Sequence, residues 1–119
     1  MLNVDEADRR ALDALERLYR AQGEPRELTG ILSRKIELGE SPAAVRGLRF
    51  AAAEVFEREL SEPFEAIPQM RAVLDADPED RDALAALDRL YQVEETWPDL
   101  LEILDRRAAL ESGWERAEL

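Results

Sequence analysis

The sequence repeats itself along the chain. Residues 8–38 and 80–110 align without a gap, and 14 of their 31 positions are identical. A fainter middle copy lies halfway between these two copies and aligns with both of them. The positions that match are Leu12, Leu48 and Leu84, then Ile31, Ile67 and Ile103, then Leu38, Leu74 and Leu110. A repeat of this length is typical of stacked structural units. We therefore expect three units, at about 7–40, 41–77 and 78–112.

Each unit divides into two predicted helices. Leu12, Leu15 and Tyr19 have the spacing of three and four residues that marks the buried stripe of a helix. Glycine is common just after a helix, as at Gly23 and Gly39. The helix starts are marked by Pro25, Ser41-Pro42, Ser61-Glu62-Pro63, Asp77-Pro78 and Thr96 with Asp99. The expected helices are about 5–22, 25–38, 42–60, one from 63 onward, 78–94 and 97–111.

No segment shows the alternation of a strand. The expected fold is therefore all-α, with a single domain over residues 1–119. One residue disturbs this pattern. Pro68 lies inside the fourth helix, where it removes a hydrogen bond and presses on the carbonyl of Phe64. We expect a kink there, or an irregular first turn up to Ile67.

The units resemble the tetratricopeptide repeat. The first helices of the outer units carry Leu12-x-x-Leu15-x-x-x-Tyr19 and Leu84-x-x-Leu87-x-x-x-Tyr91. The middle unit carries Ala66, Met70 and Val73, followed by Pro78. The resemblance covers about residues 8–112 and implies an α-solenoid of antiparallel helix pairs that binds other proteins. The small residues of the family pattern are replaced in the outer units by Glu16, Asp88, Leu28 and Leu100, which predicts looser packing within those pairs.

The C-terminal residues resemble the start of the middle unit. The stretch from Glu111-Ser112-Gly113 to Leu119 resembles the stretch from Glu40-Ser41-Pro42 to Arg46-Gly47-Leu48. Residues 113–119 are therefore expected to begin a seventh, truncated helix. On this interpretation the chain is a piece of a longer array, with one stacking face left open.

Composition excludes several functions. The chain has a net charge of −12 and contains neither cysteine nor histidine. Phosphate repels such a chain, so we expect no nucleic-acid partner. The commonest general base and the commonest zinc ligands are missing. No apolar run spans a membrane, and residues 1–6 do not resemble a signal peptide. We expect a cytoplasmic protein that has no membrane partner, cofactor, metal site or catalytic residues, and that is not an enzyme.

The acidic stretch at residues 75–80 could suggest a calcium loop. A calcium-binding EF-hand loop needs glycine at its sixth position and glutamate at its twelfth. Those positions are Asp80 and Ala86. We interpret the stretch instead as a turn between units in which Asp77 caps the next helix.

Arginines on the first helices form the predicted binding site. Carboxylates stand four residues before Arg10, Arg17 and Arg20 and could pair with them. No carboxylate stands four residues before Arg46, Arg49 or Arg89. The predicted partner-binding groove consists of Arg46, Arg49, Arg89, Arg17, Arg20 and Phe56. We expect this basic strip to bind an acidic peptide through two-pronged carboxylate contacts. For Phe56, packing against a neighbouring unit is the alternative.

Two functions remain open at this stage. The first is a non-catalytic scaffold that binds a peptide or protein partner in the concave groove. The alternative is a structural self-association module that forms a homodimer, or stacks within an array, through its open end.

Overall fold

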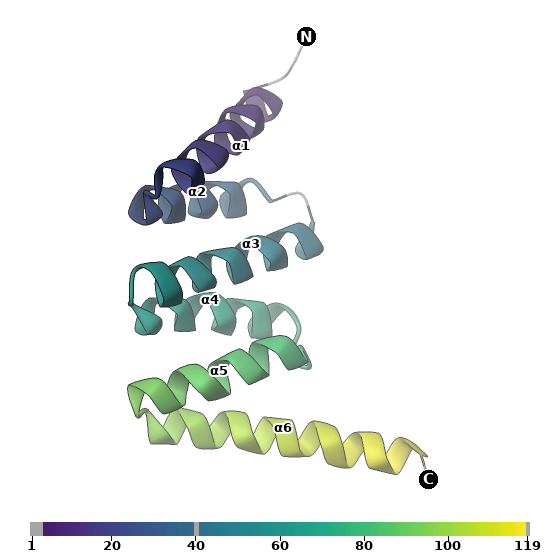
Figure 1. Cartoon of the computed structure of the whole chain (residues 1–119). Coiled ribbons are helices and arrows are strands. Elements are labelled where there is room, and N and C mark those ends of the chain that lie inside the picture. The colour runs from purple at the N-terminus through teal and green to yellow at the C-terminus, as the bar shows by residue number, and fades with distance from the viewer. Residues whose placement is uncertain (1–3, 40, 119) are drawn as a thin grey trace.

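The computed structural model describes residues 4–39 and 41–118, and the side chains of residues 8–39 and 41–111. The described chain is entirely helical, without strands, and each helix reverses the direction of the one before (Figure 1). The helices are α1 (Val4–Gln22), α2 (Pro25–Glu37), α3 (Pro42–Glu54), a π-helical turn η1 (Val55–Glu59), α4 (Pro63–Ala76), α5 (Arg81–Glu94) and α6 (Trp97–Glu118). The all-helical prediction is therefore confirmed.

Each helix packs against the helices next to it in sequence. In the described chain, α1 contacts α2, α2 contacts α3, and so on to α5 and α6, whereas α3 and α5 have no Cα atoms within 8 Å of each other. The result is an elongated stack of 55 × 33 × 19 Å (Figure 1). Its radius of gyration is 16.8 Å. A compact domain of this length would have a radius of gyration of about 13–14 Å.

The first helix of every pair ends with a residue in the left-handed conformation. In each case the N–H of the following residue donates to a carbonyl near the end of that helix, and the carbonyl belongs to an aromatic residue. The left-handed residues are Gly23 (φ 66°), Ser61 (φ 53°) and Glu95 (φ 58°). The bonds are Glu24 N to Tyr19 O at 2.9 Å, Glu62 N to Phe56 O at 2.7 Å and Thr96 N to Tyr91 O at 3.0 Å.

The fifth helix starts later than predicted. The prediction that Asp77 caps a helix beginning at residue 78 is wrong, because α5 begins at Arg81 and is capped by Asp80. The Asp80 carboxylate accepts a hydrogen bond from the Ala83 N–H at 3.1 Å. Asp77 instead accepts from the Glu79 N–H within the turn, also at 3.1 Å. Asp80 is the buried acid of the two, since it also contacts α3 as described below.

The π-helical turn shifts the repeat register. Leu60 N–H donates to Val55 O at 3.0 Å, a wider turn than that of the α-helix predicted to reach residue 60. If the middle copy lay halfway between the outer two, α4 would start at Ser61, which then corresponds to Pro25 of α2. Instead, α4 begins at Pro63. Pro63 therefore corresponds to Pro25 of α2 and to Trp97 of α6. In the same register, the buried pair Leu28 and Leu32 of α2 corresponds to Ala66 and Met70 of α4. The evenly spaced match is thus not the structural one in these second helices.

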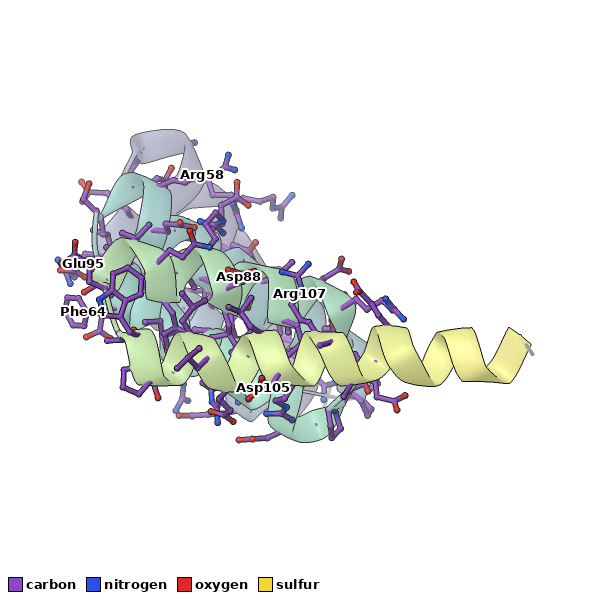
Figure 2. All side chains as sticks on the ribbon, turned by 90° about the horizontal axis from the view of Figure 1, so that it is seen from below. Arg58, Phe64, Asp88, Glu95, Asp105 and Arg107 are labelled. Carbon is purple, nitrogen blue, oxygen red and sulfur yellow. The ribbon has the colours of Figure 1, made fainter. Side chains whose placement is uncertain are left out.

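Two further expectations are wrong: the irregular first turn, which was one of the two alternatives for Pro68, and the seventh helix. Helix α4 is regular from Pro63 onward, so its first turn is not irregular. Proline has no N–H to donate to the carbonyl of Phe64, but Pro68 is exposed, so water can reach that carbonyl. The tail does not begin a seventh helix, because α6 continues to Glu118, past the end of the stack (Figure 2). Gly113 replaces the proline that starts α3, and one glycine costs a helix only about 1 kcal/mol. Leu119 lies outside the described residues.

Most of the buried residues that the structure describes form two clusters. The larger one joins α3, α4, α5 and α6, and the smaller one joins α2 and α3. Phe56 packs against both clusters. The two clusters therefore meet at the junction between α3 and η1, in the centre of the stack.

Candidate partner-binding groove

The first helices of the three pairs leave two adjoining hollows between them. The hollow between α3 and α5 has a volume of about 440 Å³, and the one between α1 and α3 has a volume of about 260 Å³. Ala51, Glu54 and Arg58 line both of them. We call this continuous surface the first-helix groove. Its residues are Arg20, Gly47, Phe50, Ala51, Ala53, Glu54, Val55, Glu57, Arg58, Glu59, Met70, Ala86, Arg89 and Leu90.

The groove is apolar at its base and electrically balanced at its rim. Phe50, Met70 and Leu90 contribute large apolar side chains, of which Met70 and Leu90 are buried. The charged lining residues are three arginines and three glutamates: Arg20, Arg58, Arg89, Glu54, Glu57 and Glu59. The prediction that this groove is basic is therefore wrong.

The structure does not bring the predicted arginines together. Arg89 and Arg20 line the first-helix groove, at its opposite ends. Arg46 and Arg49 line a separate hollow of about 230 Å³ between α3 and the C-terminal half of α4. Arg17 is exposed on α1 and lines none of these hollows. A helical wheel places residues around one helix but cannot show which neighbouring helix each residue faces.

Arg46 is bound on three sides. Its Nε and Nη2 donate to the two carboxylate oxygens of Asp80 at 2.7 and 3.2 Å. Nη2 also donates to Asp82 at 2.9 Å, and the guanidinium lies 4.6 Å from the centre of the Phe50 ring. The hydrogen bonds to Asp80 and Asp82 raise the pKa of Arg46, and the bond from Arg46 lowers the pKa of Asp80. This arginine joins α3 to α5, and its Nε and Nη2 donors are already used by Asp80 and Asp82.

Arg49 and Arg89 also have partners on other helices. Arg49 donates to the amide oxygen of Gln69 on α4 at 3.1 Å, and Arg89 on α5 pairs with Glu57 of η1. Like Arg46, they meet residues 20 to 36 positions away in sequence. The prediction that these arginines are unpaired is wrong, because it considered only partners on the same helix.

The pairs predicted within α1 are confirmed in part. Arg20 pairs with Glu16 at 3.1 Å, as predicted. Asp13 does not pair with Arg17 but with Lys35 of α2, at 2.6 Å. The predicted partner of Arg10, Glu6, lies outside the described side chains.

Phe56 packs in the core instead of lining the groove. It is half-buried, contacts both clusters and supplies the carbonyl that ends its helix, as Tyr19 and Tyr91 do in the outer units. Of the two alternatives that the sequence left open for Phe56, the structure favours packing between units.

An ion pair inside each outer unit was missed by the sequence analysis. Lys35 of α2 pairs with Glu16 of α1 at 2.7 Å, and Arg107 of α6 pairs with Asp88 of α5 at 2.5 Å. These residues occupy equivalent positions in the two copies, so the repeat itself contained the signal. Partial burial lowers the pKa of Lys35, but its hydrogen bonds to Asp13 and Glu16 outweigh this and raise it. Glu16 and Asp88, which replace small residues of the family pattern, therefore each pair with a cation on the second helix of their unit.

The middle unit has apolar residues in the corresponding place. When Pro63 is aligned with Pro25, Val73 of α4 corresponds to Lys35 of α2. Val73 belongs to the larger core cluster together with Ala53 of α3, and both residues are buried. The middle unit is thus more apolar inside than either outer unit, in agreement with its divergent sequence.

The described part of the chain contains neither a candidate metal site nor a candidate membrane span. No group of three or more His, Cys, Asp or Glu residues there could hold a metal ion. No helix of the described chain is both long and apolar enough to cross a membrane.

No protein-family model, curated protein or solved structure matches the chain. The resemblance to the tetratricopeptide repeat therefore remains a prediction that rests on the internal repeat and its residues.

Proposed function

We propose that the chain is a non-catalytic protein-interaction scaffold, an α-solenoid of tetratricopeptide type that binds a segment of a partner protein in the first-helix groove. The internal repeat and the packing of each helix on its sequence neighbours support the solenoid. The chain has no histidine or cysteine, and two of the three groove carboxylates, Glu54 and Glu57, pair with arginines.

The groove itself is the observation that carries the proposal. No Cα atoms of α3 and α5 lie within 8 Å of each other, and the hollow between these helices is open over the half-buried Phe50, with the buried Met70 and Leu90 at its base. Apolar surface that a monomer leaves accessible in a concave site is a common feature of binding sites. The three arginines and three glutamates around it can set the orientation of a bound segment.

The partner is best described as an amphipathic segment. An acidic peptide was the expectation from the sequence, but it depended on unpaired arginines, and Arg46 and Arg89 are occupied by Asp80 and Glu57. An apolar side that meets Phe50, Ala51 and Ala86, with charges of both signs beside it, fits the groove better than a uniformly acidic chain.

Two helical glycines allow a matched test. Gly47 lines the groove and Gly30 lies on α2, outside it, and an added Cβ would meet no atom within 4 Å at either position. Replacing a helical glycine by glutamine stabilises a helix by up to about 1 kcal/mol. Gly47→Gln should therefore fill the groove without loss of stability, and Gly30→Gln should leave the groove open.

Peptides selected on the wild-type chain from a random phage-displayed library provide the probe. Isothermal titration should show similar dissociation constants for wild type and Gly30→Gln, and at least a tenfold increase for Gly47→Gln. Both variants should melt at or above the wild-type temperature. Failure to select any peptide, or equal affinity for Gly47→Gln, would contradict groove binding.

A further inference from the structure

Helix α6 exposes an apolar stripe on the side that faces away from α5. Leu101 is 62% exposed and Leu104 is 42% exposed, and Ala108 is also exposed. Their spacing of three and four residues places them on one face of the helix. Leu100 and Ile103, which face α5, are buried. Figure 2 shows α6 from the side on which no other helix covers it.

The corresponding residues of the other second helices are covered. When Trp97 is aligned with Pro63, Leu101, Leu104 and Ala108 correspond to Ile67, Met70 and Leu74 of α4. Met70 and Leu74 are each 1% exposed and belong to the cluster that α5 completes, and Ile67 packs against it. In α2, the equivalent Leu32 is buried in the cluster with Ala52 and Val55 of the next helix pair, and the equivalent Thr29 is buried as well. The chain itself therefore shows what covers this face: the first helix of a following pair.

Helix α1, at the other end of the stack, exposes the complementary face. In α5 the residues Ala83, Ala86 and Leu90 belong to or pack against the cluster shared with α4, and Ala83 and Leu90 are buried. Their equivalents in the first copy of the repeat are Ala11, Ala14 and Leu18 of α1. Ala11 and Ala14 are exposed, and Leu18 is 46% exposed. No helix precedes α1 in the described chain to cover them.

We infer that copies of this chain associate head to tail, with α6 of one copy packed on α1 of the next in the way α4 packs on α5. In this arrangement Leu101, Leu104 and Ala108 of one copy cover Ala11, Ala14 and Leu18 of the other. The occupant of each open end is thus a second copy of the chain, and the contact repeats an interface that the chain already contains.

The charges beside the two stripes are compatible with this contact. Glu102 and Asp105 lie beside the stripe of α6, and Arg10 and Arg17 lie beside the stripe of α1, all four exposed. Glu102 also pairs with Arg71 and Arg106 of its own copy, at 3.3 and 3.4 Å. Contact therefore brings acids next to arginines. The contact joins two different surfaces, so a copy added to one end leaves another open end and assembly does not stop at the dimer.

Two lysine substitutions test the inference. Leu101→Lys disrupts the α6 face and Leu18→Lys disrupts the α1 face, and the exposure of both leucines means that the folded monomer should keep its helical signal and melting temperature. Val93→Lys is the control, since Val93 is 58% exposed but lies on α5, inside the stack. Sedimentation equilibrium from about 10 µM to 1 mM gives the mass.

The expected result has three parts. The wild type and Val93→Lys gain mass with concentration beyond that of a dimer, and each end variant alone stays monomeric. An equimolar mixture of Leu101→Lys and Leu18→Lys forms a dimer and stops there, because each contributes one intact end. A wild type that is monomeric at 1 mM overturns the inference. So does either end variant that still associates alone, since that contact would join two identical faces. Peptide binding by Leu101→Lys tests the groove separately, because α6 does not line it.

Discussion

The Asp80 carboxylate should be the most sensitive polar group of the stack. It is 7% exposed, caps α5 through the Ala83 N–H at 3.1 Å and holds Arg46 of α3 through both oxygens. Removing a helix N-cap costs about 1 kcal/mol, and removing a hydrogen bond to a charged group costs about 1.5–3 kcal/mol. Because Arg46 keeps contact with water and with Asp82, we take the low end of this range. Asp80→Ala should then lower the free energy of unfolding by about 2–3 kcal/mol.

Two further variants separate the cap from the charge. Asn is as good an N-cap as Asp, so Asp80→Asn should lose only the charge-assisted part and cost about 1–2 kcal/mol. Asp82 binds the same arginine at 2.9 Å, but its side chain is 79% exposed. Asp82→Ala should therefore change the stability by less than about 0.5 kcal/mol. Urea unfolding, followed by circular dichroism at pH 7, measures all three.

The difference between wild type and Asp80→Asn should also depend on pH in one direction. Arg46 lowers the pKa of Asp80 in the folded chain below the unfolded value of about 3.9. The stabilising contribution is therefore complete above that unfolded value and disappears as the pH falls through the folded pKa. The two proteins should differ by a constant amount between pH 5 and 7 and converge in acid. Equal stability of Asp80→Ala and Asp82→Ala, or a difference that grows in acid, would refute the assignment.

Three smaller predictions concern backbone and core, each checked by urea unfolding. Glu95 adopts a left-handed backbone conformation (φ 58°) that is strained for a residue with a side chain, whereas the equivalent residue in the first unit is Gly23. Glu95→Gly should therefore stabilise the chain by about 0.5–1 kcal/mol, and a loss of stability would argue against strain at this position. A Cβ at Gly39 would overlap Val45, so Gly39→Ala should cost about 1–3 kcal/mol, and a neutral effect would mean that the turn yields. Leu32 is fully buried, so Leu32→Ala should cost about 2–5 kcal/mol, and less than 1 kcal/mol would contradict the packing of α2 on α3.

Most helices and their ends could be predicted from the sequence, because the signals for them are local. Gly23 adopts a backbone conformation that glycine takes more easily than other residues, and Pro25 and Pro63 stand at the first helical position that proline favours. The spacing of apolar residues then determines which stripe is buried. These effects depend on a residue and its nearest neighbours along the chain, so the all-helical fold and the positions of most helices followed from the sequence alone.

The groove depended on contacts that no local pattern shows. The partners of Arg46 and Arg89 stand 32 to 36 positions away, and they came together only when the helices stacked. The choice of Asp80 over Asp77 as a helix cap followed the same contact with Arg46. The π-helical turn moved the start of α4 from Ser61 to Pro63 relative to the repeat. The sequence alone determined how each helix forms. The tertiary structure decided which residues of different helices meet, because that depends on the register between helices.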